Sequence, residues 1–364
     1  MATVAMVLAI ITLLPLLRIT HWLVRVWDFP RVQIVVLAAI NALAGAALYR
    51  TGSISLPLAI VVSTLCLAWH LSWIWAYTRV HSPEVPDAPG DLGARHLRLM
   101  TANVLMTNRH VSEFVTLVRS QNPDILVTLE TDLRWQRELG ALHDQFPHRL
   151  DCPLDNLYGM HVFSRLPLVD PRIQYLVEEQ IPSMHLEVKP WADRDGICLH
   201  FVHPAPPSPS ENEESTERDA ELLVVAKAVR DDPRPLIVAG DLNDVAWSKT
   251  TRLFRKISRL LDPRIGRGMY NTFHARWPMM RFPLDHVFLS SHFSLVSMAR
   301  AAVPGSDHFA IIIEVALGRR AQVHHSIEKP DREDWTEAKE RITMADANTA
   351  SVHQPSAANQ GVTP

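Results

Sequence analysis

Three long apolar runs without a charged side chain occupy the first 78 residues of the chain. They cover residues 1–17, 32–49 and 51–78, and the third ends in a cluster of Trp and Tyr. An α-helix rises about 1.5 Å per residue, so roughly 20 apolar residues cross the hydrocarbon core of a bilayer. Trp and Tyr at the end of such a run are typical of the membrane interface. We therefore predict a membrane region over residues 1–79, with spans at about 2–17, 32–49 and 54–78.

Two alternatives to this reading concern the same runs. The first run is short enough for a cleaved signal peptide, but no basic segment precedes it and two more apolar runs follow. The runs could also form a buried helical hairpin of a soluble protein. Arginines lie mainly between the first two runs and after the third. Because Arg-rich flanks face the cytoplasm, we expect a multi-pass protein of the cell membrane with a cytoplasmic C-terminal part; a periplasmic or other extracytoplasmic position is the alternative.

The rest of the chain alternates between short strand patterns and helical patterns. Residues 80–95 are rich in Pro and Gly, which predicts a linker. A folded domain is expected over 96–317, where strands outnumber helices, so we predict an α/β fold with stacked sheets between outer helices. Residues 318–364 are polar and charged, which predicts a disordered tail. A short helix near residues 333–344 is the alternative.

Composition and charge exclude a few classes of protein. The 364 residues include 36 Lys and Arg against 39 Asp and Glu, a formal net charge of -3. This argues against electrostatic capture of nucleic acid by the whole protein, although a local basic groove stays possible. The 3 cysteines have no CxxC spacing, so neither a disulfide scaffold nor a cysteine zinc site is expected.

Polar side chains stand at or just after the apolar strand patterns. They are Asn103, Glu130, Asp241, Asn243, Asp285, Asp307 and His308. Hard divalent cations such as Mg²⁺ prefer oxygen ligands, and one or two carboxylates with a substrate phosphate can hold them. A histidine next to an aspartate adds a group that titrates near pH 7. The residues alone therefore fit a metal-assisted hydrolase, but each of them could equally cap a strand or form a turn.

The order of the local motifs narrows the choice. The stretches TANVL, LVTLE, GMHVFSR, FVHP, IVAGDLND, FPLDHVFLS and GSDHFAI resemble, in this order, the motifs of the endonuclease/exonuclease/phosphatase superfamily. The resemblance covers about residues 96–317, and GDLN followed by SDH is its most specific part. The string GDLNDVAWS resembles the bacterial membrane-anchored branch. The resemblance implies a four-layer, DNase I-like α/β sandwich, here preceded by three transmembrane helices.

The resemblance also implies a role for each site residue. Asp241 matches the aspartate that orients or deprotonates the attacking water, and Asp285 matches the one that fixes the tautomer of the catalytic His308. Glu130, with help from Asn103 and Asp307, matches the metal-binding positions. The remaining catalytic positions, which contact the phosphate, are Asn243 and His203. The expected cofactor is Mg²⁺, or Mn²⁺ in its place.

The expected function is a membrane-anchored, divalent-metal-dependent phosphoesterase that hydrolyses a phosphodiester or phosphomonoester by direct attack of water. Its expected partners are the lipid bilayer and a phosphate ester, which could be a phospholipid, a nucleic acid or a sugar phosphate. Nothing in the sequence indicates an obligate protein partner. The alternatives are a membrane scaffold whose phosphoesterase-like domain only binds a ligand, and a transport or sensing protein. For the latter, only His70 and Asn41 are polar candidates within the spans.

Overall fold

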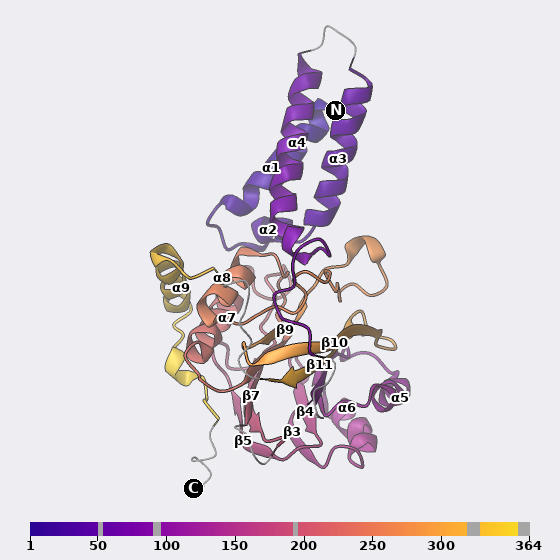
Figure 1. The fold of residues 1–364 in the computed structure, drawn as a ribbon, viewed down its shortest axis with the longest axis vertical. Coiled ribbons are helices and arrows are strands. Elements are labelled where there is room, and N and C mark those ends of the chain that lie inside the picture. The colour runs from indigo at the N-terminus through magenta and orange to yellow at the C-terminus, as the bar shows by residue number, and fades with distance from the viewer. Residues whose placement is uncertain (50–53, 90–95, 192–195, 319–327, 356–364) are drawn as a thin grey trace.

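The computed structural model describes residues 1–49, 54–89, 96–191, 196–318 and 328–355. A bundle of helices from the first part of the chain stands on one end of a domain built from two sheets (Figure 1). The bundle consists of α1 (Ala2–Leu13), α3 (Arg31–Ala47) and α4 (Ser55–Ile74), with the short α2 (Trp22–Arg25) at its base. The three apolar runs are thus helical, as their composition predicts.

Among the described residues of the bundle, one helix has the dimensions of a membrane span by itself. Within the residues described, the helix Ser55–Tyr77 is long and apolar enough to cross a membrane. The helices Trp22–Asp28 and Arg31–Ala47 pass this test only as a pair, which is bent by 69°, and the helix Ala2–Leu16 is shorter. One span, or two if the bent pair counts as one, meets the criterion, so the three predicted transmembrane helices are not confirmed. The first helix is too short for this criterion. Its α-helical part ends before Pro15, and the chain continues there as a 3₁₀ turn.

The domain contains two mixed β-sheets. The six-stranded sheet has the order β10-β11-β1-β2-β4-β3, and the five-stranded sheet has the order β5-β6-β7-β8-β9. In the first sheet the strands are β1 (His96–Asn103), β2 (Ile125–Leu129), β3 (His148–Cys152), β4 (Met160–Ser164), β10 (Phe293–Ala302) and β11 (Phe309–Leu317). In the second they are β5 (Leu168–Gln174), β6 (Ser183–Val188), β7 (Ile197–Phe201), β8 (Leu236–Asp241) and β9 (Asp285–Leu289). The pairs β1–β2 and β7–β8 are parallel, and the other neighbouring strands of the two sheets are antiparallel.

The two sheets pack face to face and carry helices on their outer faces. Leu99 and Val127 of the first sheet share one apolar core with Leu199 and Ile237 of the second. Two helices, α5 (Val111–Gln121) and α6 (Leu133–Glu138), cover the first sheet. The second sheet is covered by α7 (Thr216–Val229) and α8 (Lys249–Ser258). Because both faces of β2 and β8 are covered, every residue of these strands is buried and they read as continuous apolar runs. The result is the layered α/β sandwich that the sequence predicts.

The segment between the bundle and the domain is docked and does not act as a free tether. Val85 is fully buried in the core between the sheets. The Glu84 carboxylate lies 2.5 Å from the Arg255 guanidinium, and the Ala88 N–H donates to the Leu295 carbonyl over 2.8 Å. The predicted linker over 80–95 therefore connects the bundle to the domain, and its residues 84–88 pack against the domain. The Pro-rich composition of this segment does not show which of its side chains contact the domain. Residues 90–95 lie outside the described part.

The expected disordered tail is wrong where the structure describes it. Helix α9 (Arg332–Met344) begins with a capping box formed by Asp331 and Asp334. Ala338 and Ile342 join the apolar cluster of α7 and α8, and Arg341 forms a 2.6 Å ion pair with Asp219. The helix that the sequence offers as the alternative is thus confirmed. Residues 319–327 and 356–364 of the predicted tail lie outside the described ranges.

A buried glutamate in α7 makes stability depend on pH. Glu221 is 1% exposed, and within the described ranges its Oε1 has no hydrogen-bond partner. Burial, together with the charge of Glu178, raises the pKa of Glu221 to about 8. The folded state therefore holds this proton while the unfolded chain releases it near pH 4.5, so stability is lost as pH rises from 4.5 through 8.

Glu221→Gln should remove this loss. The stability of the variant relative to wild type should grow by about 3 kcal/mol between pH 4.5 and pH 7. Thermal unfolding of the full chain in detergent at both pH values measures the difference. The matched control is Glu138→Gln, an exposed position on α6, which should show no such trend. An equal pH trend in both variants would contradict the burial of an uncompensated carboxyl at Glu221.

Candidate active site

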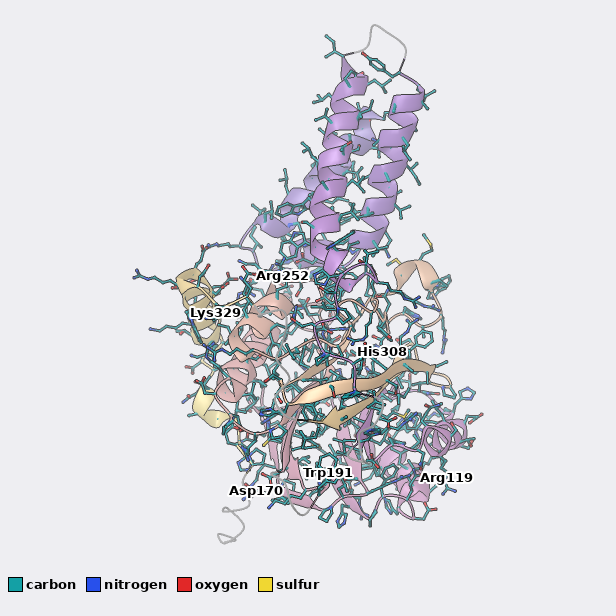
Figure 2. The ribbon with its side chains drawn as sticks, in the orientation of Figure 1. Arg119, Asp170, Trp191, Arg252, His308 and Lys329 are labelled. Atoms are coloured by element: carbon teal, nitrogen blue, oxygen red, sulfur yellow. The ribbon has the colours of Figure 1, made fainter. Side chains whose placement is uncertain are left out.

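The predicted site residues meet where the ends of the two sheets converge. Asn103 is the last residue of β1, and Glu130 directly follows the neighbouring parallel strand β2. In the other sheet, Asp241 at the end of β8 pairs with Asp285 at the start of β9. The two groups touch, because the Asn103 Nδ2 donates to Asp241 Oδ2 over 3.2 Å. This end of the domain is the one nearer the bundle, where His308 lies (Figure 2).

The backbone at the strand ends adopts conformations that favour glycine. Glu130 has φ 60° and Asn243 has φ 50°, left-handed values that cost of order 1–3 kcal/mol each and cluster at functional sites. A Cβ at Gly240 would lie 1.9 Å from the Val202 carbonyl oxygen. The GDLN motif therefore needs its glycine for close packing of β8 against Val202, and its turn lets the Asp241 Oδ1 accept the Asn243 N–H over 3.0 Å.

His308 lies between two buried carboxylates. Its Nδ1 is 2.8 Å from Asp285 Oδ2, and its Nε2 is 3.6 Å from Asp241 Oδ2. Burial by itself would lower the pKa of His308, but the charges of Asp285 and Asp241 outweigh it and raise the pKa to about 10. The pKa of Asp241 is lowered: burial opposes ionisation, but the nearby His308 and His203 and two N–H donors favour it. At neutral pH the site therefore holds an imidazolium, oriented by Asp285, beside an ionised Asp241.

His203 differs from His308 in its charge. Its Nε2 lies 4.0 Å from Asp241 Oδ2, and within the described residues its buried Nδ1 has no hydrogen-bond partner. Burial lowers the pKa of His203 to about 4, with Asp241 opposing and His308 adding to the shift. The ring is neutral at pH 7, so it can donate one N–H to a phosphate oxygen but cannot neutralise its charge.

Glu130 and Asp307 provide the oxygen ligands that a hard cation prefers. The Glu130 Oε1 accepts from Asn103 Nδ2 over 2.7 Å, and in the part of the chain that the structure describes no Lys or Arg forms an ion pair with Glu130. Burial raises the pKa of Glu130 to about 7, and the carboxylates of Asp241 and Asp307 contribute to this shift. A divalent cation would relieve this concentration of buried negative charge, so the donor set fits one.

Two details qualify the predicted ligand set. The Asn103 Oδ1 accepts the Leu105 N–H over 3.1 Å while its Nδ2 faces Glu130 and Asp241. Asn103 therefore positions both carboxylates, and its amide would have to turn over to act as a ligand. Asp241, Asp285 and His308 also bring one possible ligand atom each within 4.8 Å of one another. Because His308 Nδ1 already faces Asp285, that group is better explained as a hydrogen-bonded pair beside Asp241.

The structure brings all eight predicted residues together. Six of them line a cleft of about 440 Å³, and the other two, Asn103 and Asp285, lie behind it in hydrogen bonds to Glu130 and His308. The six are Glu130, His203, Asp241, Asn243, Asp307 and His308. Sequence reasoning missed the apolar walls of the cleft, which include Trp22, Val26, Phe29, Leu157, Tyr158 and Phe273. The proline-rich stretch after His203 could have pointed to one rim, but nothing in the sequence marks residues 22–29 as part of the site.

Comparisons with known proteins agree with this geometry. The sequence model of the endonuclease/exonuclease/phosphatase family matches residues 100–308. The crystal structure of an endonuclease/exonuclease/phosphatase from Beutenbergia cavernae superposes with a TM-score of 0.50 at 18% identity, covering 62% of this chain and 72% of that one. The catalytic domain of human Nocturnin, solved with a bound sulfate anion, superposes with a TM-score of 0.50 at 17% identity, covering 63% of this chain and 96% of that one. These likenesses show the fold. No curated protein sequence matches the chain.

Proposed function

The chain belongs to the endonuclease/exonuclease/phosphatase family, and we propose that it is a membrane-anchored phosphoesterase that requires a divalent metal, Mg²⁺ or Mn²⁺. The observation that carries this proposal is the meeting of Glu130, Asp241 and the Asp285–His308 pair in one cleft. These groups come from both sheets and from four separate strand ends. An acidic pocket, an ionised base and an oriented imidazolium are what hydrolysis of a phosphate ester needs.

Each residue has a role in direct attack of water on phosphorus. Asp241 is ionised and accepts the proton of the attacking water. His308, held by Asp285, offers its Nε2–H to a phosphoryl oxygen as charge develops there, and the neutral His203 donates a second hydrogen bond. Asn243 stands beside Asp241 to contact the phosphate. A divalent cation held by Glu130 and Asp307 would polarise the phosphoryl oxygens and offset their charge. No covalent intermediate on the protein is required.

Membrane anchoring is supported by the outer surface of the bundle. Large apolar side chains point away from its centre along α1, α3 and α4; Leu43, for example, is 71% exposed. A continuous exposed apolar surface of this kind is rare on a soluble monomer. We propose that all three helices lie in the bilayer as a unit over residues 1–79, that residues 96–317 form the catalytic domain, and that the arginines at the bundle base place this domain in the cytoplasm.

Hydrolysis of bis-p-nitrophenyl phosphate by the full chain in detergent tests the proposed function. With Mg²⁺ the protein should release p-nitrophenol, EDTA should abolish the release, and added Mg²⁺ should restore it. The Asp241→Asn variant, prepared in the same way, measures any contaminating activity. Activity that survives EDTA would contradict the metal dependence. Failure to hydrolyse this diester and a panel of phosphomonoesters would instead support a scaffold that only binds its ligand.

A further inference from the structure

The cleft is acidic at its base and apolar along its walls. The wall nearest the bundle consists of Trp22, Val26 and Phe29, which belong to the segment between α1 and α3. The lining also includes Leu157, Tyr158, Phe273, Leu284 and prolines 206, 207 and 209. The membrane region therefore supplies part of the substrate site, and the catalytic domain alone would lack one wall.

This wall is held in place by specific contacts. The Trp22 N–H donates to the Glu213 carbonyl over 2.9 Å, and the Ser215 N–H donates back to Thr20 over 3.0 Å. At the other end of the segment, the Trp247 Nε1–H donates to the Asp28 carbonyl over 2.9 Å. The first two bonds join backbone groups, and the third comes from the indole of Trp247, which is itself buried. The cleft is thus fixed against the base of the bundle.

Further contacts fasten the end of the third apolar helix to the same face of the domain. The Tyr77 hydroxyl donates to the Ala246 carbonyl over 2.6 Å, and the Arg252 guanidinium lies 4.5 Å from the centre of the Trp73 ring. Figure 2 shows Arg252 at the foot of the bundle, on the same side of the domain as His308. If the bundle lies in the bilayer, the cleft therefore opens close to the membrane surface.

An exposed apolar tip lies at the same level. Trp277 and Met279 are 65% and 76% exposed, and Met280 beside them is also exposed. The Gln33 Nε2 donates to the Met279 carbonyl over 2.6 Å, which ties this tip to the first turn of α3. In Figure 1 the tip is the short orange turn beside the base of the bundle. Exposed Trp and Met are costly in water but favourable in the interfacial layer of a bilayer.

The charge of the cleft distinguishes between substrate classes. None of the described residues that line it is a lysine or an arginine. Proteins that bind nucleic acids neutralise successive phosphates with such side chains, so a polyanionic strand lacks its usual partners here. A single phosphate group next to a hydrocarbon chain fits the same lining, because the acidic base can hold a cation and the walls are apolar.

We propose that the substrate is a phosphate ester of a lipid in the same bilayer. This inference rests on the proposed function and names its substrate class. The phosphate group enters the cleft between Glu130 and His308, while the apolar part of the lipid stays against Trp22, Val26 and Phe29. Water attacks the phosphorus while Asp241 takes its proton, the phosphorus–oxygen bond to the leaving alcohol breaks, and the alcohol oxygen takes up a proton, so the products are the free alcohol and a phosphate or phosphomonoester.

The test uses the full chain in two settings. In the first, the protein is reconstituted into vesicles of phosphatidylethanolamine, phosphatidylglycerol, phosphatidic acid and a polyisoprenyl phosphate, and the released phosphate species are measured. In the second, the protein in lipid-free detergent is given bis-p-nitrophenyl phosphate or a single-stranded oligonucleotide. We expect metal-dependent hydrolysis of at least one vesicle lipid at a higher kcat/KM than that for the oligonucleotide.

A matched pair of variants links this activity to the wall. Val26→Ser should lower the ratio of lipid to soluble-diester kcat/KM about tenfold, the value of one lost apolar contact of this size. Leu23→Ser, on α2 three residues before Val26 but outside the cleft, should leave both activities unchanged. If the soluble diester is hydrolysed but no vesicle lipid is, or if the oligonucleotide is preferred, the lipid inference is overturned while the proposed function stands. If the diester, the lipids and the oligonucleotide are all left intact, both are overturned.

Discussion

Asp241→Asn should slow phosphoester hydrolysis by about 10²–10⁴-fold, or about 3–5 kcal/mol of barrier, with little change in metal affinity. The side chain is buried and ionised, and it faces both His308 and His203. Asparagine keeps the volume and can still accept the Asn243 N–H, but it cannot take the proton of the attacking water. The measurement is kcat at saturating Mg²⁺, together with the Mg²⁺ concentration that gives half-maximal rate.

The control for this substitution is the fold of the variant. In the wild type the Asn103 Nδ2 donates to the Asp241 carboxylate over 3.2 Å. In the variant the same Nδ2 faces an amide group, so the thermal unfolding of the variant should be compared with that of the wild type. A correctly folded variant that loses less than tenfold in kcat would remove Asp241 from the role of general base.

The second large effect is expected from the pair of His308 and Asp285. His308→Ala should cost about as much in rate as Asp241→Asn. Asp285→Asn should act through His308, because their 2.8 Å hydrogen bond orients the ring and the Asp285 charge keeps its pKa high. The double variant should therefore be little slower than His308→Ala alone, since residues that work as a unit give non-additive losses.

A matched substitution separates the chemical effect from a structural one. His308→Gln keeps a side chain that can donate a hydrogen bond to Asp285, so it should fold like wild type and still lose most of the rate. Rate constants for the two single variants and the double variant form the cycle. Strictly additive losses would show that Asp285 and His308 do not act together.

The sequence alone points to the individual site residues because each stands at or beside the end of an apolar strand pattern. Asp241 is the last residue of a fully buried strand, and Glu130 directly follows another. The same pattern does not show that Asn103 and Asp241, which belong to different sheets, share a hydrogen bond. That hydrogen bond depends on how the two sheets pack against each other. The sequence predicts this packing only through the order of the family motifs.

Other parts depend on single contacts that leave no periodic pattern. Val85 packs in the core and so fixes the proline-rich segment to the domain. The ion pair of Arg341 with Asp219 holds α9 against α7. The wall of Trp22 and Val26 arises from the way the bundle sits on the domain. Apolar composition predicts the helices of the bundle but does not determine how many of them cross a bilayer, since among the helices that the structure describes only Ser55–Tyr77 reaches the required length by itself.

The most direct test of the central claim is the Mg²⁺ dependence of phosphodiester hydrolysis by the wild-type chain and by Glu130→Gln. Loss of an outer partner of a metal ligand typically weakens metal binding 10–100-fold, and loss of the ligand itself should weaken it at least as much. We therefore expect wild type to be inactive in EDTA and to recover with Mg²⁺, and Glu130→Gln to need at least about tenfold more Mg²⁺ while folding normally. Wild-type activity that persists in EDTA, or an unchanged Mg²⁺ requirement in Glu130→Gln, would contradict the account.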